Sequence, residues 1–299
     1  MENVLIFASE KEVRFTKLLK FIVPTYLTSL FNTVYTIIDG IFVSTYVGTN
    51  ALASINIVYP IVNVLTGIAL VFATGGSSVT ALYIGGNRKK EADRSFSASS
   101  FAAILLGCLV SLMILTNLSA ILTILGATPV TIAGCKTYAR WWLLAAPVVI
   151  GKELFTYFIR VDGAPTYSFI TALSGGILNI VLDYILVGQM QMGIYGAALA
   201  TILGLVLSFS MGIYYFIHKQ KYLSFTLHNL SLREAMHCML MVHPNLSINL
   251  LLQLQPSYLT ALHSPLPVKT VSPQFPSSCI CSFCLSVSTL AFLWAWHHL

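Results

Sequence analysis

Residues 175–188 read GGILNIVLDYILVG, and this stretch indicates what kind of protein the chain is. It is apolar enough to lie in lipid, yet it contains Asn179 and Asp183. Four residues apart on a helix, the amide and the carboxylate lie on one face, about 6 Å apart. A carboxylate in the hydrocarbon layer is costly, so we expect Asp183 to face a bundle interior or a watery cavity. The alternative is an interhelical hydrogen bond that only holds helices together.

The composition around this stretch indicates an integral membrane protein. Hydrophobic residues make up 57% of the 299 residues and charged residues only 9%, whereas soluble domains contain about 25% charged residues. Residues 1–20 show no signal-peptide cleavage pattern, so we expect the first helix to target the chain. The net charge of +6 does not favour a nucleic-acid partner, because the basic residues fall in short clusters between apolar spans.

Six apolar spans are each long enough to cross ~30 Å of hydrocarbon. They cover about residues 18–47, 52–84, 96–118, 138–159, 167–187 and 194–217. The predicted fold class is therefore an all-α membrane protein with a six-transmembrane-helix bundle. We expect a cytoplasmic N-terminus over residues 1–17, the bundle over residues 18–221, and an atypical tail over residues 222–299.

Basic residues alternate between the connections. They precede the first span, lie between the second and third, end the fourth, and follow the sixth, whereas residues 48–51, 119–129 and 188–193 contain no Lys or Arg. The positive-inside rule then predicts that the N-terminus and the basic connections are cytoplasmic. Near the opposite end of the fourth span, we expect Arg140, Trp141 and Trp142 to act as interfacial anchors.

Polar side chains from three spans are predicted to converge. At a rise of 1.5 Å per residue, Asp39 and Thr201 lie roughly 12 Å and Asp183 roughly 8 Å below the outer ends of their spans, with Asn179 one turn deeper. Two carboxylates, an amide and a hydroxyl form a hard-oxygen set that suits Na⁺ or protons better than Mg²⁺ or Zn²⁺. No nucleophile–base motif, phosphate loop or HExxH occurs, so an enzyme is not indicated.

Three further residues inside spans carry weaker signals. Lys152 and Glu153 lie near the cytoplasmic end of the fourth span, and adjacent helix residues do not face each other. We therefore expect them to be interfacial rather than a simple pair, with Lys152 extending to the membrane surface, and a functional role is the alternative. Pro24 in the first span removes a helical hydrogen bond and is either a fixed packing feature or a hinge.

Several of these motifs resemble the multidrug and toxic compound extrusion family. They include Asp39-Gly-Ile-Phe-Val, Arg160-Val-Asp-Gly-Ala-Pro165 and Asn179-Ile-Val-Leu-Asp183, and the resemblance covers about residues 15–220. It implies one lobe of a twelve-helix, two-lobe transporter that exports organic cations and drugs in exchange for Na⁺ or H⁺ by alternating access. It also implies a cation site on Asp39, Asn179, Asp183 and Thr201, a hinge near Pro24, and no cofactor beyond the coupling ion.

The resemblance ends at about Met236. Residues 255–278 are rich in Pro and Ser, and residues 279–296 form an apolar run with Cys279, Cys281 and Cys284 at its start. This run fits a seventh span, an interfacial segment, or the remnant of a truncated or frame-shifted reading frame. The three cysteines lack a clear fourth ligand for a metal. The expected partners are therefore membrane lipid, cationic drugs, and a second lobe or a second copy of the chain.

Two other functions remain open from the sequence. A lipid-linked oligosaccharide flippase of the same superfamily would favour basic residues along a central cavity, and these spans carry few. An inactive membrane fragment or a receptor-like bundle would need no ion site, and in a receptor the acids would meet a ligand amine.

Overall fold

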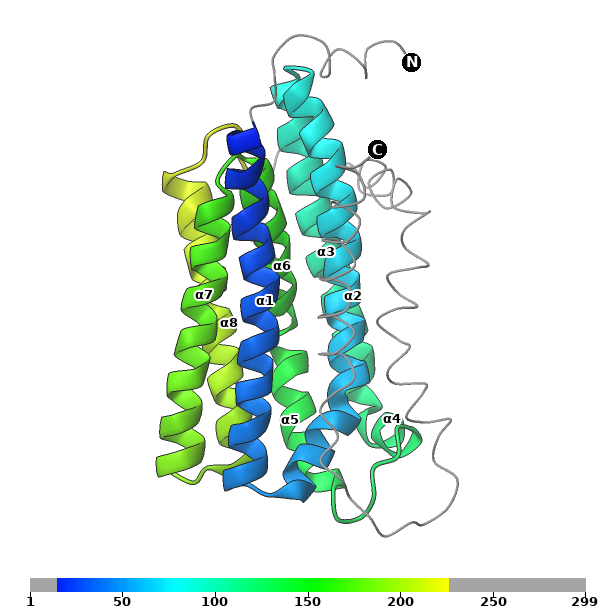
Figure 1. The fold of residues 1–299 in the computed structure, drawn as a ribbon. Coiled ribbons are helices and arrows are strands. Elements are labelled where there is room, and N and C mark those ends of the chain that lie inside the picture. The colour runs from blue at the N-terminus through cyan, green and yellow to red at the C-terminus, as the bar shows by residue number, and fades with distance from the viewer. Residues whose placement is uncertain (1–14, 226–299) are drawn as a thin grey trace, which may run out of the picture.

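The computed structural model describes residues 15–225 as a helical bundle (Figure 1). No strand occurs in this range. In chain order, the elements are α1 (Phe15–Tyr46), α2 (Thr49–Gly85), α3 (Lys89–Thr116), α4 (Leu118–Ile124), α5 (Ile132–Leu144), α6 (Ala146–Val161), α7 (Pro165–Leu182), the π-helical segment η3 (Asp183–Gln189) and α8 (Gly193–His218).

Five helical segments in the described range are each long and apolar enough to cross a membrane, and α5 and α6 make a sixth span if they are taken as a bent pair. This confirms the predicted all-α membrane bundle. The single span expected over 138–159 is bent, because α5 and α6 meet at an angle of 56°. Pro147 lies in the first turn of α6, where its missing N–H would have no helical partner anyway, so the helix restarts there in a new direction.

The connections alternate between two ends of the bundle (Figure 1). The α2–α3 and α6–α7 turns and the chain after α8 lie at the end where α1 begins. We call this the basic end, because it carries Arg88, Lys90, Arg160 and Lys219. The opposite end carries the short α1–α2 turn and α4, a helix in the segment that the sequence had suggested was a loop.

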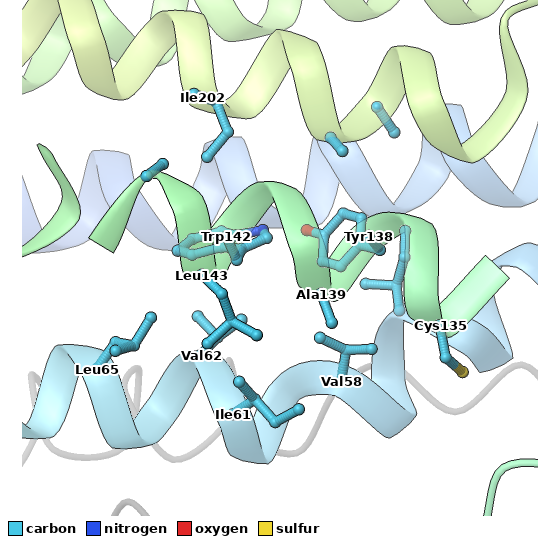
Figure 2. Packing of buried hydrophobic residues seen from close by; sticks show 14 of the residues in the cluster. Val58, Ile61, Val62, Leu65, Cys135, Tyr138, Ala139, Trp142, Leu143 and Ile202 are labelled. Carbon is cyan, nitrogen blue, oxygen red and sulfur yellow. The ribbon is translucent and has the colours of Figure 1, made fainter. Parts of the chain in front are cut away.

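The buried core has two parts, each toward one end of the bundle. In the first, aliphatic side chains of α2 such as Val58 and Val62 pack against Tyr138 and Trp142 of α5, with Ile202 of α8 beside them (Figure 2). The second part is aromatic. The Phe96 ring centroid lies 4.7 Å from that of Phe158 and 4.6 Å from that of Phe216.

Small residues bring α7 and α8 into backbone contact. A Cβ atom added at Gly204 would lie 2.5 Å from the Gly175 carbonyl oxygen, and one added at Gly175 would lie 2.0 Å from Ser208 Oγ. The Ser208 hydroxyl donates across this contact to the Thr171 carbonyl oxygen, at 3.0 Å. Such close approach is typical of membrane helices with small interface residues. It aligns the polar faces of α7 and α8.

A buried carboxylate fastens the chain beyond α8 to the bundle. Asp162, in the α6–α7 turn, is 0% exposed and accepts a 2.7 Å hydrogen bond from the Tyr215 hydroxyl. It also accepts backbone N–H bonds of 2.7–2.9 Å from residues 221, 222 and 223. Asp93 of α3 accepts one more, from the Ser224 N–H at 2.7 Å. The chain therefore stays on the bundle beyond residue 221, where we had expected the lobe to end.

Candidate functional site

The interior of the bundle contains a carboxylate without a hydrogen-bond partner in the protein. Asp183 is 0% exposed, and neither of its oxygens has a partner. It is the first residue of η3, where the α7 helix widens. Such π-helical turns are rare and often lie at functional sites, because they change the direction of the side chains that follow.

Asp39 of α1 lies within interaction distance of Asp183, since α1 packs directly against η3. One Asp39 oxygen is buried and also lacks a hydrogen-bond partner. Two negative charges this close repel each other, and a shared proton or a bound cation removes the repulsion. The pair therefore has the chemistry of a cation site.

Asn179 and Thr201 complete the set. The Asn179 Nδ2 group donates to Thr201 Oγ1 at 3.4 Å, and the Thr201 hydroxyl donates to the Ala197 carbonyl oxygen at 2.9 Å. Asn179 Oδ1 is buried without a partner, and Asn179 also lies within interaction distance of Asp183. The structure thus brings together all four residues that the sequence singled out, from α1, α7, η3 and α8.

Sequence reasoning missed the α5 side of this site. Tyr138 is only 5% exposed and lies within interaction distance of both Asp39 and Asp183. Trp142, expected in an interfacial belt, is instead 9% exposed in the core beside Tyr138, with its indole N–H unpartnered (Figure 2). That expectation was wrong because it treated α5 as a helix end, whereas α5 packs one face along α2. The signal in the sequence was the i, i+4 spacing of Tyr138 and Trp142, which places both side chains on one face of α5.

The expected placement of Lys152 and Glu153 also needs correction. The Lys152 ammonium group donates to Glu153 Oε1 at 2.7 Å, and the side chains are 9% and 23% exposed. Adjacent residues can pair here because the flexible lysine stem bends back along the helix surface. Lys152 therefore points into the bundle and does not extend to the membrane surface.

Lys152 lines a small cavity of about 20 Å³ together with two residues of the candidate site, Asn179 and Thr201. Asn32 and Tyr35 of α1 form another side of this cavity. A space of this size can hold about one water molecule. The cavity makes the Lys152 region and the candidate site neighbours inside the same bundle.

Pro24, the expected hinge, lies inside α1, which continues through it from Phe15 to Tyr46. The Thr28 hydroxyl donates to the Pro24 carbonyl oxygen at 2.8 Å. The hinge role stays a prediction. The expectations for residues 1–14 and for the tail from residue 226, including Cys279, Cys281 and Cys284, lie outside the described residues.

Comparison with known proteins gives one family match. The MatE family model matches residues 24–185, just over half of the chain. The multidrug export protein MepA of Staphylococcus saprophyticus is 29% identical over 227 residues. The match covers 76% of this chain and 50% of that protein, so the chain spans about half the length of the curated relatives it matches.

Solved structures agree with this match. One, described as the outward-facing conformation of a multidrug resistance MATE family transporter of the MOP superfamily, superposes with a TM-score of 0.73 at 26% identity, over 83% of this chain and 57% of that one. Another, a MOP superfamily transporter from Pyrococcus furiosus described as having reversed polarity in its binding pocket, gives 0.73 at 27% identity, over the same two fractions.

Proposed function

Because this chain belongs to the MatE family, we propose that it forms one lobe of an exporter for organic cations and drugs, driven by inward movement of Na⁺ or H⁺. The chain is a multi-pass membrane protein. In the proposed cycle, a coupling cation binds at Asp39, Asn179, Asp183 and Thr201. Its arrival changes the charge in the lobe interior, and bending of α1 near Pro24 relays the change to the drug pathway.

One observation carries the proposal: the buried Asp183 carboxylate has no hydrogen-bond partner and lies beside Asp39. A structural carboxylate in a membrane bundle would normally be satisfied by donors, as Asp162 is by four of them. Leaving buried polar oxygens without donors is costly, and such sites mark ion pathways in membrane proteins. A bound cation or proton would supply the positively charged partner that the protein does not give to Asp183.

The rest of the transporter is also part of the proposal. The relatives are about twice as long as the matched region. A drug pathway between two lobes would therefore require a second lobe or a second copy of this chain. We place the protein in the plasma membrane with its N-terminus and basic end in the cytoplasm, on the basis of the positive-inside rule.

The test is ethidium efflux from cells that express the 299-residue chain, measured with and without a Na⁺ or proton gradient. We expect gradient-dependent efflux that is abolished by Asp183→Asn and by Asp39→Asn, because either change removes a negative charge from the site. Glu91→Gln, which neutralises an acid of α3 near the basic end, is the matched control and should keep full efflux.

Membrane levels of each variant, measured by immunoblotting, separate loss of function from loss of insertion. Unchanged efflux in both Asp→Asn variants would refute the site. Absence of efflux from a well-expressed unmodified chain would refute transport by this chain.

A further inference from the structure

An ion pair that the proposed cycle does not use lies next to the candidate cation site. Among the described residues, Lys152 and Glu153 form the one pair that meets an ion-pair distance, 2.7 Å. Lys152 is on the middle turns of α6, and its side chain is 9% exposed. Burying two charges costs more than a packed apolar pair of similar size, so stability is a weak reason for such a pair.

The cavity connects this pair to the site. Lys152 lines it on one side, and Asn179 and Thr201 line it on another. Tyr35, also in the lining, lies within interaction distance of Lys152, Glu153 and Asp39. The remaining ionisable groups that act on Lys152 are Glu153 and Arg160 of its own helix. The ammonium group is therefore a fixed positive charge on the cavity that Asn179 and Thr201 of the candidate site also line.

We propose that the Lys152–Glu153 pair sets how tightly the Asp39–Asp183 site holds a monovalent cation, with Lys152 opposing binding and Glu153 favouring it. The inference rests on the proposed cation site. Paired, the two charges largely cancel at the site, so the affinity depends on the balance between them.

Coulomb's law sets the scale of the effect. For a separation on the order of 10 Å and an effective dielectric constant of about 20, a single unit charge would change the affinity of a cation site by roughly tenfold. Removing one member of the pair exposes the full effect of the other. The two single variants should therefore shift the affinity in opposite directions, which a purely structural role does not predict.

The experiment uses the purified full-length chain in detergent with four variants: Lys152→Met, Glu153→Gln, the double variant, and Lys152→Arg. Na⁺ binding is measured by calorimetry at fixed pH, and proton binding by the infrared band of protonated carboxyl groups during acid titration. These two arms distinguish Na⁺ from protons as the cation. Lys136→Met, on α5 and away from the cavity lining, is the matched control.

We expect Lys152→Met to tighten cation binding about tenfold and Glu153→Gln to weaken it about tenfold. The cation affinity of the double variant should return to within about threefold of that of the unmodified chain. The affinities of Lys152→Arg and Lys136→Met should stay near the unmodified value. Because the double variant leaves no unpaired buried charge, it reports on the inference even if a single variant folds poorly.

Shifts in the same direction for both single variants, or no shift, would overturn the inference. So would a double variant that departs from the unmodified affinity by as much as the single variants do. Suppose that the unmodified chain binds a cation and that Asp183→Asn abolishes binding. If the variants at Lys152 and Glu153 then leave the cation affinity unchanged, this inference alone fails. If the unmodified chain binds neither Na⁺ nor protons, the proposed cation site fails and this inference fails with it.

Discussion

The four residues of the candidate site do not contribute equally. Asp39 and Asp183 carry the charge, and three of their four carboxylate oxygens are buried without a protein partner. Thr201 contributes only a hydroxyl, and this hydroxyl already donates to the Ala197 carbonyl oxygen of its own helix. Its contact with Asn179 is long, at 3.4 Å. We therefore expect the carboxylates to decide whether a cation binds and Thr201 to adjust how well.

Thr201→Val tests this ranking. The valine keeps the shape and removes the hydroxyl, so cation affinity should fall by about fivefold, the value of roughly one neutral hydrogen bond. Calorimetric Na⁺ titration, or proton titration, measures the change. Thr171→Val is the control, because Thr171 makes the same bond to its own helix, 2.9 Å to the Tyr167 carbonyl oxygen. A loss as complete as that from Asp183→Asn would contradict the ranking.

The sequence predicted these four residues because two simple rules apply to them. The i, i+4 spacing placed Asn179 and Asp183 on one face, and the rise per residue placed Asp39 and Thr201 at similar depth. Tyr138 was missed because a tyrosine on an apolar helix gives no sign of which neighbour its hydroxyl meets. The Lys152–Glu153 pair was missed because spacing rules describe Cβ directions and not the reach of a long, flexible stem.

The helices were predictable in number but not in detail. Apolar length marked six spans, and the structure matches them within a few residues at most ends. The 56° break between α5 and α6 lies at Pro147, a residue type that can kink a span, but hydropathy carries no information on the size of the bend. The change from α7 to η3 at Asp183 was likewise absent from the pattern, because an extra residue per turn alters neither composition nor span length.

The α7–α8 contact provides a test at the level of helix packing. Gly175→Ala would place a methyl group 2.0 Å from Ser208 Oγ and 2.6 Å from the Gly204 carbonyl oxygen, which is backbone and cannot turn aside. We expect the variant to lose about 1–3 kcal/mol of stability, as overpacked interiors do. Thermal unfolding of the purified chain in detergent measures the loss.

The control for this test is Gly40→Ala in α1, where nothing lies within 4 Å of the added Cβ atom. It should unfold at or slightly above the temperature of the unmodified chain, because alanine favours helix more than glycine does. Equal stability of both variants would mean that α7 and α8 do not approach as closely as described.

The orientation of the bundle in the membrane can be tested by labelling. Thr128 is exposed at the end opposite the basic end, and Lys90 is exposed at the basic end, so each is replaced by cysteine in turn. In a background without native cysteines, a membrane-impermeant maleimide added to intact cells should label Thr128→Cys and not Lys90→Cys. Permeabilised cells should show both labelled. The reverse pattern in intact cells would place the N-terminus outside.

The Asp162 junction has a consequence for anything joined to this bundle. Three successive backbone N–H groups after α8 and one side-chain hydroxyl converge on that carboxylate, and Leu223 beside them is 0% exposed. The polypeptide therefore departs from the bundle along a fixed heading rather than from a loose tether. A fluorescent reporter or a second bundle grafted after Phe225 would therefore start at a fixed place relative to the ends of α3 and α6, and its point of attachment would turn together with the lobe.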